Sequence, residues 1–542
     1  MHRASMVYHR CLNVAAILAL ACFSTFTACA HAGAAAIQLG NLNGSNGFRL
    51  DGESAGDDSG FSVAGAGDIN GDGIDDVVIG AARSDSNGFE SGSSYVVFGR
   101  ADDFAASVEL VALDGHNGFR LTGATAFEES GHSVAGAGDI NGDGIDDLVI
   151  GAPFADSNGA MSGTSYVVFG RRDGFPASVD LGTLDGNDGF RLDGTSGRYF
   201  SGGSVAGAGD INGDGVDDLV IGATYPVVKG DYPGSSYVVF GRTSGFPAIL
   251  DLGTLDGTDG FRLDGVKAGA QSGYPVAAAG DLNADGIDDL VIGAYLASPN
   301  GYASGSSYVV FGHGGAFAGN VSLSALDGHG GFRIDGIAAN EFSGLSVSGA
   351  GDINGDGIDD LMIGASGDGA FAGSSYVLFG HSGDFPVSLR LDAFDGSNGF
   401  RLDGLAPVDY SGSSVADADD INGDGLDDLL IGASGADPNG SGSGSSYVFF
   451  GHLGKFPASL SLGTLDGNNG FRLDGVAAGD SSGYSVAHAG DVNGDGIDDL
   501  VIGAPFASPN GGATGSAYVV FGHHDRVFCD GFDGGACLSR AH

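Results

Sequence analysis

The sequence predicts an all-β protein, a seven-bladed β-propeller with four-stranded blades. Three observations lead to this prediction. The motif D-x-N-x-D-G-x-D-D occurs seven times, at intervals of 71 residues except for one of 68. Each interval contains four strand-like segments, and the two ends of the chain are out of phase with the repeat. A repeat of this length holds a whole supersecondary unit, so we expect each copy to form one blade.

The four strand-like segments have different characters, which predict their places in the blade. In the first unit they are 62–67 (Ser-Val-Ala-Gly-Ala-Gly), 77–81 (Val-Val-Ile-Gly-Ala), 94–99 (Ser-Tyr-Val-Val-Phe-Gly) and 118–121 (Gly-Phe-Arg-Leu). The small residues of the first segment suit the crowded innermost position. The apolar run of the second predicts a strand buried on both faces.

The ends of the repeat predict how the ring closes. A fourth-strand segment, 47–50, begins the repeat array, whereas the seventh unit ends after its third segment, 517–521. We expect the N-terminal strand to complete the last blade, because closure removes sheet edges that would otherwise aggregate.

One arginine occupies the same fourth-strand position in every unit: Arg49, Arg120, Arg191, Arg262, Arg333, Arg401 and Arg472. An ion pair with a neighbouring aspartate is the simplest expectation for each. A ring of arginines that binds an anion is the alternative.

The seven acidic loops predict calcium sites, with up to seven Ca²⁺ ions per chain. Calcium takes six to eight oxygen ligands, and a loop supplies them when carboxylates and amides alternate around a glycine. In the first loop Gly73 permits the turn and Ile74 offers its carbonyl. The predicted side-chain ligands, at loop positions 1, 3, 5 and 9, are Asp68, Asn70, Asp72 and Asp76; Asp139, Asn141, Asp143 and Asp147; Asp210, Asn212, Asp214 and Asp218; Asp281, Asn283, Asp285 and Asp289; Asp352, Asn354, Asp356 and Asp360; Asp420, Asn422, Asp424 and Asp428; and Asp491, Asn493, Asp495 and Asp499.

Two loops depart from the pattern, and three other interpretations of the motif fit it less well. Ala284 replaces a glycine at position 4, and Asp417 and Asp419 replace glycines before the sixth loop. Simple Asp-Asn-Gly turns would not need the same four oxygens in seven copies. An EF-hand or a dockerin-type loop is disfavoured by the apolar Ile79 at position 12.

These segments resemble the FG-GAP repeats of integrin α-chain propellers and their secreted bacterial relatives. The resemblance rests on 60–63 (Gly-Phe-Ser-Val) and on the Gly-Ala-Pro triplets at 151–153 and 503–505, and it covers residues 36–522. It implies calcium loops on one face and a partner site on the opposite face. In integrin α-chains only some blades carry such loops, whereas all seven do here. The propeller of glycosylphosphatidylinositol-specific phospholipase D is also similar, but its zinc-binding catalytic domain has no counterpart in this sequence.

The chain divides into a predicted signal peptide (1–32), the propeller (33–522) and a C-terminal tail (523–542). The apolar run near the start is too short to span a bilayer and precedes small residues that suit signal peptidase. Cys29 lies in a poor context for acylation. Cys529 and Cys537 are expected to pair in an oxidising compartment. We therefore expect a secreted or cell-surface protein, with the periplasm as an alternative.

The predicted function is that of a binding or adhesion module for an extracellular protein or glycan. A net charge of −48 disfavours nucleic acid as a partner, and no segment after the export signal is long and apolar enough to span a membrane.

We expect a monomer without catalytic residues and without a cofactor other than calcium. The segment 52–56 matches a serine-hydrolase elbow but lacks the following helix, and histidines such as His116, His132, His313 and His488 fall at scattered repeat positions. An extracellular enzyme, either a polysaccharide lyase or a hydrolase, and a purely structural surface protein are the alternatives.

The ligand is expected on the loops that join strand two to strand three and one blade to the next. These loops vary most between units, at 83–90, 153–161, 195–200, 224–232 and 294–303, and scaffold repeats vary the loops that touch partners. Aromatic residues gather there and are expected to anchor the partner: Tyr199, Phe200, Tyr225, Tyr232, Tyr295 and Tyr302.

Overall fold

The computed structural model describes residues 36–224 and 232–523. The chain divides into two compact units, Met1–Gly33 and Ala34–His542, and every described residue belongs to the second. The predicted signal peptide, the cysteine pair of the tail and Tyr225 lie outside the described residues. In the described part of the chain, no helix has the length and apolar character needed to cross a membrane.

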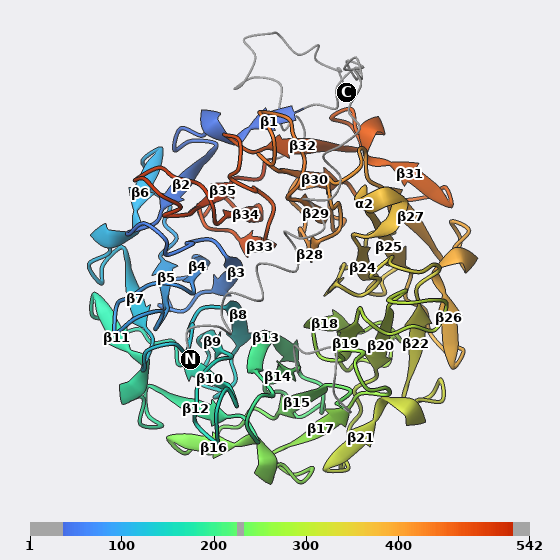
Figure 1. Ribbon diagram of the computed structural model, residues 1–542, viewed down its shortest axis with the longest axis horizontal. Coiled ribbons are helices and arrows are strands. Elements are labelled where there is room, and N and C mark those ends of the chain that lie inside the picture. The colour runs from blue at the N-terminus through green and yellow to red at the C-terminus, as the bar shows by residue number, and fades with distance from the viewer. Residues whose placement is uncertain (1–35, 225–231, 524–542) are drawn as a thin grey trace, which may run out of the picture. The chain divides into compact units, whose positions relative to one another are not determined.

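Seven sheets stand around a common axis, as the sequence predicts (Figure 1). Each contains four consecutive antiparallel strands, with the Ser-Val-Ala-Gly-Ala-Gly type of segment innermost. The innermost strands are β3 Ser62–Gly67, β8 Ser133–Gly138, β13 Ser201–Gly209, β18 Val276–Gly280, β23 Ser346–Gly349, β28 Ser414–Asp417 and β33 Val486–Gly490. The second strands are β4 Asp76–Ala81, β9 Asp147–Ala152, β14 Asp218–Ala223, β19 Asp289–Ala294, β24 Leu361–Ala365, β29 Leu429–Ala433 and β34 Asp499–Ala504.

The outer half of each blade follows the same order. The third strands are β5 Ser93–Val97, β10 Thr164–Val168, β15 Ser235–Val239, β20 Ser306–Val310, β25 Ser374–Leu378, β30 Ser445–Phe449 and β35 Ser516–Val520. The fourth strands are β7 Gly118–Thr122, β12 Gly189–Asp193, β17 Gly260–Asp264, β22 Gly331–Asp335, β27 Gly399–Asp403, β32 Gly470–Asp474 and β2 Gly47–Asp51. A short helix, α2 Asp368–Phe371, lies between β24 and β25.

The four antiparallel strands predicted for each blade are present, and a further short strand that was not predicted extends each sheet. This fifth strand has three residues and comes from the unit that follows in the ring. It pairs parallel with the fourth strand of the sheet it joins, as β11 does with β7 and β6 with β2. These strands are β1 Ala36–Gln38, β6 Ser107–Glu109, β11 Ser178–Asp180, β16 Ile249–Asp251, β21 Asn320–Ser322, β26 Ser388–Arg390 and β31 Ser459–Ser461. A 3₁₀ turn follows each of them: η1 Leu39–Asn41, η2 Leu110–Ala112, η3 Leu181–Thr183, η4 Leu252–Thr254, η5 Leu323–Ala325, η6 Leu391–Ala393 and η7 Leu462–Thr464. Three residues are too few to show a recognisable period in the sequence.

The N-terminal segment closes the ring in two blades. Strand β2 pairs antiparallel with β35, with Phe48 opposite Val519, so the predicted closure is confirmed. Strand β1 also pairs parallel with β32, which joins the same segment to the sixth blade. Figure 1 shows the first strands, in blue, beside the last strands, in red.

The core lies between neighbouring blades. Along β4, Val77 and Ile79 pack toward the seventh blade, whereas Val78 packs toward the second. Successive side chains of a strand point to opposite faces, so a strand between two blades is apolar throughout. The innermost strands come close enough that a Cβ on Gly136 would lie 3.1 Å from the carbonyl oxygen of Gly65, which explains the small residues there.

The predicted arginine ion pairs are present in six units. Each of these arginines pairs with the aspartate two residues further along: Arg49–Asp51, Arg191–Asp193, Arg262–Asp264, Arg333–Asp335, Arg401–Asp403 and Arg472–Asp474. In the remaining unit Thr122 stands in place of the aspartate, and Arg120 pairs with Glu53 at 3.1 Å.

Candidate functional site

The acidic loops join the innermost strand of each blade to the second strand, and all emerge on one face of the propeller. In the first loop the Asp68 carboxylate accepts hydrogen bonds from the backbone N–H of Asp72 at 2.9 Å and of Gly73 at 2.7 Å. The position-1 aspartate makes the same two contacts in all seven loops. Gly71 and Gly73 have φ of 72° and 92°, so the tight turn requires left-handed backbone at positions 4 and 6.

The aspartate at position 9 is fully buried in every loop. Asp76 is 0% exposed, and its carboxylate accepts the N–H of Gly99 at 2.9 Å and faces the Asn70 side-chain nitrogen at 3.2 Å. Burial is the main cause that raises the pKa of Asp147 to about 8, and the charges of Asp143 and Asp139 act in the same direction. The corresponding carboxyl groups behave alike: burial raises the pKa of Asp218, Asp289 and Asp360 to about 8 and that of Asp428 to about 9.

The structure brings the four predicted ligands of each loop into one turn, where they contact one another and the backbone. Among the described residues no three His, Cys, Asp or Glu side chains converge into a ready-made cage. The donor set nevertheless fits a hard divalent cation, because it consists of oxygens, with three carboxylates and one amide per loop. Burial beside two like charges is costly for the position-9 carboxylate, and a cation would offset that cost.

Two departures seen in the sequence have clear structural counterparts. Ala284 adopts φ 59° at loop position 4, where the other units have glycine at 69–74°, so the expected strain is present. Asp419 adopts φ 46°, and its carboxylate lies 2.8 Å from Nδ1 of His488 in the next blade.

Sequence reasoning missed the aspartate at loop position 8. In the second loop Asp146 does not turn toward its own loop, and its carboxylate accepts the backbone N–H of Asp68 in the first blade at 2.8 Å. The signal was visible, because this aspartate is repeated in all seven copies of the motif.

A second missed position follows the third strand and carries a basic side chain in every unit: Arg100, Arg171, Arg242, His313, His381, His452 and His523. Four histidines therefore share one repeat position, so the expectation of scattered placement is wrong for His313, whereas His116, His132 and His488 do stand at separate positions. The Arg171 backbone N–H donates to the carbonyl of Ile69 in the preceding acidic loop at 2.9 Å. The guanidinium lies 4.4 Å from the Phe175 ring centroid and lines a cleft of about 580 Å³ beside Asn141 and Asp143.

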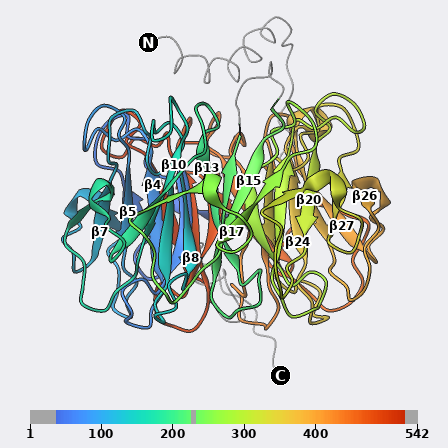
Figure 2. The same cartoon turned by 90° about the horizontal axis from the view of Figure 1, so that it is seen from below.

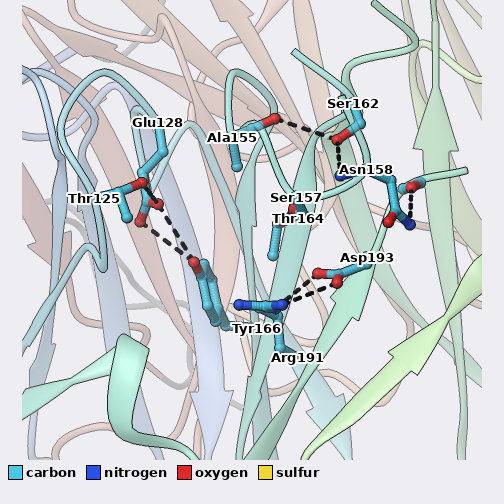
Figure 3. Close-up of polar contacts among 11 residues, drawn as sticks. Thr125, Glu128, Ala155, Ser157, Asn158, Ser162, Thr164, Tyr166, Arg191 and Asp193 are labelled. Atoms are coloured by element: carbon cyan, nitrogen blue, oxygen red, sulfur yellow. Dashed lines mark hydrogen bonds and ion pairs between the residues drawn. The ribbon is translucent and has the colours of Figure 1, made fainter. Parts of the chain in front are cut away.

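The loops on the opposite face are tied to one another. Figure 2 shows the strands running between two faces that carry loops. Asn158, between strands two and three of the second blade, donates to the carbonyl of Gly194 at 2.9 Å, and its backbone N–H donates to the Ser162 hydroxyl at 2.9 Å (Figure 3). Asn87, Asn300, Asn439 and Asn510 make the corresponding contact to the next link. In five of the seven blades an asparagine thus fixes this loop against the next link.

Buried acids support the same loops and were not predicted. Glu128 is 1% exposed and accepts a hydrogen bond from the Ala124 N–H at 2.6 Å. It also accepts hydrogen bonds from the Thr125 hydroxyl at 2.7 Å and the Tyr166 hydroxyl at 3.4 Å (Figure 3). Burial raises its pKa. Acids occupy the same repeat position in four other units: Asp57, Glu341, Asp409 and Asp480.

The predicted aromatic anchors are exposed to different degrees. Tyr302 and Tyr232 are 65% and 47% exposed. Tyr199 is half-buried against Tyr232, and Phe200 packs edge-on against Phe154. Tyr295 is half-buried, and its hydroxyl donates to the Gln271 side chain at 2.6 Å.

Two further aromatics on this face were not predicted as anchors. Phe89 and Phe127 are 57% and 56% exposed, and their rings lie 5.4 Å apart.

Comparison with known proteins agrees with the fold and the repeat. The FG-GAP repeat model matches residues 59–97, 130–168, 201–239, 273–310, 343–378, 411–449 and 482–520. Integrin alpha-PS5 of Drosophila melanogaster is 35% identical over 191 residues, which cover 33% of this chain and 17% of the relative. Integrin alpha-2 of Mus musculus is 33% identical over 172 residues, 32% of this chain and 13% of the relative.

Other similarities are more limited. Phosphatidylinositol-glycan-specific phospholipase D of Bos taurus is 35% identical over 184 residues, which cover 31% of this chain and 20% of the relative. The match to the crystal structure of AofleA from Arthrobotrys oligospora covers 80% of this chain and 94% of that chain, with a TM-score of 0.35 and 9% identity. The matched regions span a fifth or less of each of these three curated relatives. With seven matched repeats, one in each blade, the chain belongs to the FG-GAP repeat proteins and resembles integrin α-chains.

Proposed function

We propose that this chain is a secreted, calcium-binding propeller that acts as a binding or adhesion module for an extracellular protein or glycan. Residues 1–32 would direct export, and the seven acidic loops would hold up to seven Ca²⁺ ions as structural elements. The observation that carries the proposal is the fully buried position-9 aspartate, which lies beside two further carboxylates in all seven loops.

Calcium would act mainly on stability. Each loop keeps a buried carboxylate whose ionised form is unfavourable without a cation, so bound calcium would favour the folded state. When the free Ca²⁺ concentration is a hundred times the dissociation constant of a site, binding at that site stabilises the folded state by about 2.7 kcal/mol.

Two measurements test the calcium proposal. The melting temperature is expected to fall markedly in excess EDTA and to recover with added Ca²⁺. Asp147→Asn is expected to reduce the calcium bound per chain by one ion after equilibrium dialysis, whereas the control Asp102→Asn, at an exposed site, keeps the full number. An identical melting curve with and without EDTA would contradict the proposal.

The partner would bind on the face opposite the acidic loops. Exposed aromatic side chains gather on tied loops there, and rigid aromatic side chains give contact area at a low entropic cost. The resemblance to integrin α-chains supports an adhesion role rather than an enzymatic one.

A glycan and protein array probed with the full chain in calcium tests this role. We expect binders whose signal is lost in Tyr302→Ala and Tyr232→Ala variants that melt like the wild type. The proposed location would be contradicted if these two variants bind like the wild type and binding is lost when exposed residues of the acidic-loop face are changed. Turnover of a polysaccharide by the wild-type protein would favour the enzymatic alternative.

A further inference from the structure

The position-8 aspartates form a chain of contacts from blade to blade. Each carboxylate accepts the backbone N–H of the position-1 aspartate in the preceding blade, at 2.6–2.9 Å in six of the seven junctions. The donor and acceptor pairs are Asp68 and Asp146, Asp139 and Asp217, Asp210 and Asp288, Asp281 and Asp359, Asp352 and Asp427, and Asp491 and Asp75. The last pair joins the seventh blade to the first, across the closure of the ring.

The residue before the acidic loop is glycine in six of the seven units, and its lack of a side chain leaves room for this contact. A Cβ on Gly67 would collide with the Asp146 carboxylate, and the corresponding glycine meets the position-8 aspartate in the same way in five other junctions. Glycine is needed here for two reasons, since Gly67 also has φ 62°. The small residue therefore makes room for a specific carboxylate from the next blade.

The seventh junction joins the sixth blade to the seventh and has the same contact, but the residue before its acidic loop is an aspartate instead of glycine. Asp498 accepts a hydrogen bond from the backbone of Asp420, as in the other junctions. Asp419 occupies the place of the usual glycine and contacts His488. We therefore expect the link between the sixth and seventh blades to be the weakest.

Each of these contacts joins the ligand frameworks of two loops. Asp146 lies between Ile145, at loop position 7, and Asp147, the buried position-9 aspartate that is the predicted ligand of the second loop. Its partner Asp68 is the position-1 ligand of the first loop and organises the turn by accepting the N–H of Asp72 and Gly73. A fixed second loop therefore holds Asp146 in place, and Asp146 holds the backbone of the first loop.

From this arrangement we propose that the position-8 aspartates couple neighbouring calcium loops around the ring, so that calcium binds cooperatively. The inference rests on the calcium proposal above. Asp146 and its counterparts are positioning residues: they bind no ion themselves and order the adjacent site. Coupling of this kind is reciprocal and typically changes affinity about fivefold or more.

Calorimetric titration of the full, metal-free chain with Ca²⁺ tests the coupling. The wild type is expected to give a Hill coefficient above 1. Asp146→Ala removes the contact but keeps all 28 predicted side-chain ligands. It is expected to bind the same number of ions with a lower Hill coefficient and a first-blade site weakened on the order of fivefold. Asp146→Asn keeps an oxygen acceptor and the packing, so it is expected to fall between the two and serves if the alanine variant does not fold.

The control is Asp102→Ala, which removes an exposed carboxylate that is not part of the chain of contacts. It is expected to titrate like the wild type. A wild-type Hill coefficient of 1, with isotherms of the Asp146 variants matching that of Asp102→Ala, would overturn the coupling while calcium binding stands. No calcium uptake by the wild type would instead overturn the calcium proposal and the coupling with it.

Discussion

Phe127 packs its exposed ring against that of Phe89 while holding a left-handed backbone conformation, with φ 70° and ring centroids 5.4 Å apart. The same repeat position is occupied by Gly56, Gly269 and Gly479 in three other units, all with positive φ. A bulky side chain in this conformation costs about 1–2 kcal/mol. Arg198, Asn340 and Val408 hold the same conformation at this position in the other three units, so the exposed phenylalanine pair, and not the strain, distinguishes the second blade.

Phe127→Gly is therefore expected to stabilise the protein by about 1 kcal/mol while weakening partner binding. Chemical denaturation and the array described above provide the two readouts. Val408→Gly relieves the same strain in the sixth blade, where φ is 75°, and leaves the phenylalanine pair intact. It is the matched control, expected to gain stability and to keep binding. Equal binding by both variants would contradict a role for the pair.

Ala284→Gly is expected to stabilise the fourth blade by about 1 kcal/mol in saturating calcium, because Ala284 adopts the left-handed conformation that glycine tolerates without strain. The reciprocal change, Gly494→Ala, introduces the strain into the seventh loop, where the nearest atom to the new Cβ is Ile74 Cδ1 at 3.3 Å. It is expected to lose a similar amount. Urea denaturation of the two variants and the wild type measures both changes in unfolding free energy. A lower unfolding free energy for Ala284→Gly would contradict the presence of strain at this position.

Asp57, which supports the loops on the face opposite the acidic loops, is expected to make the free energy of unfolding depend on pH. Burial is the main cause that raises its pKa to about 6 from the usual 3.8, so the folded state binds the proton more tightly than the unfolded state. This contribution is fully present below about pH 4 and is lost as pH rises through about 6. The loss is on the order of 1 kcal/mol after allowance for solvent screening.

Asp57→Asn keeps an oxygen that can accept the Ser54 N–H and cannot ionise. Its unfolding free energy is expected to fall less than that of the wild type between pH 4 and pH 7. Asp102→Asn, at an exposed position, is expected to follow the wild type. Parallel curves for all three proteins would rule out the assignment.

Removal of residues 33–52 is expected to open the ring and cause aggregation, because it deletes the partners of both β35 and β32. Two sheet edges would then be exposed. A chain that begins at residue 36 keeps both strands and is expected to remain folded. Size-exclusion chromatography and thermal melting distinguish the two, and a monomeric, fully stable product of the larger deletion would contradict the role of closure.

Much of the fold could be predicted because the repeat presents the same local chemistry seven times. The Val-Val-Ile runs, the small residues of strands such as β3 and the offset of 47–50 each depend on a short stretch of sequence. The three-residue strands could not be predicted, since a segment such as Ser107–Glu109 has one partly buried apolar residue, Val108, and pairs with a strand from another blade. The four predicted ligands of each loop were brought together because they lie within nine residues of one another.

The sequence by itself determined the number of blades, the order of their strands, the way the ring closes and the residues of each acidic loop, because these follow from local patterns repeated at a fixed spacing. Only the tertiary structure decided which groups meet across blades. The contact of Asp146 with Asp68 joins residues 78 positions apart, and that of Asp75 with Asp491 joins residues 416 apart. Such contacts depend on how one sheet packs against the next, a distance and orientation that no local stretch of sequence encodes.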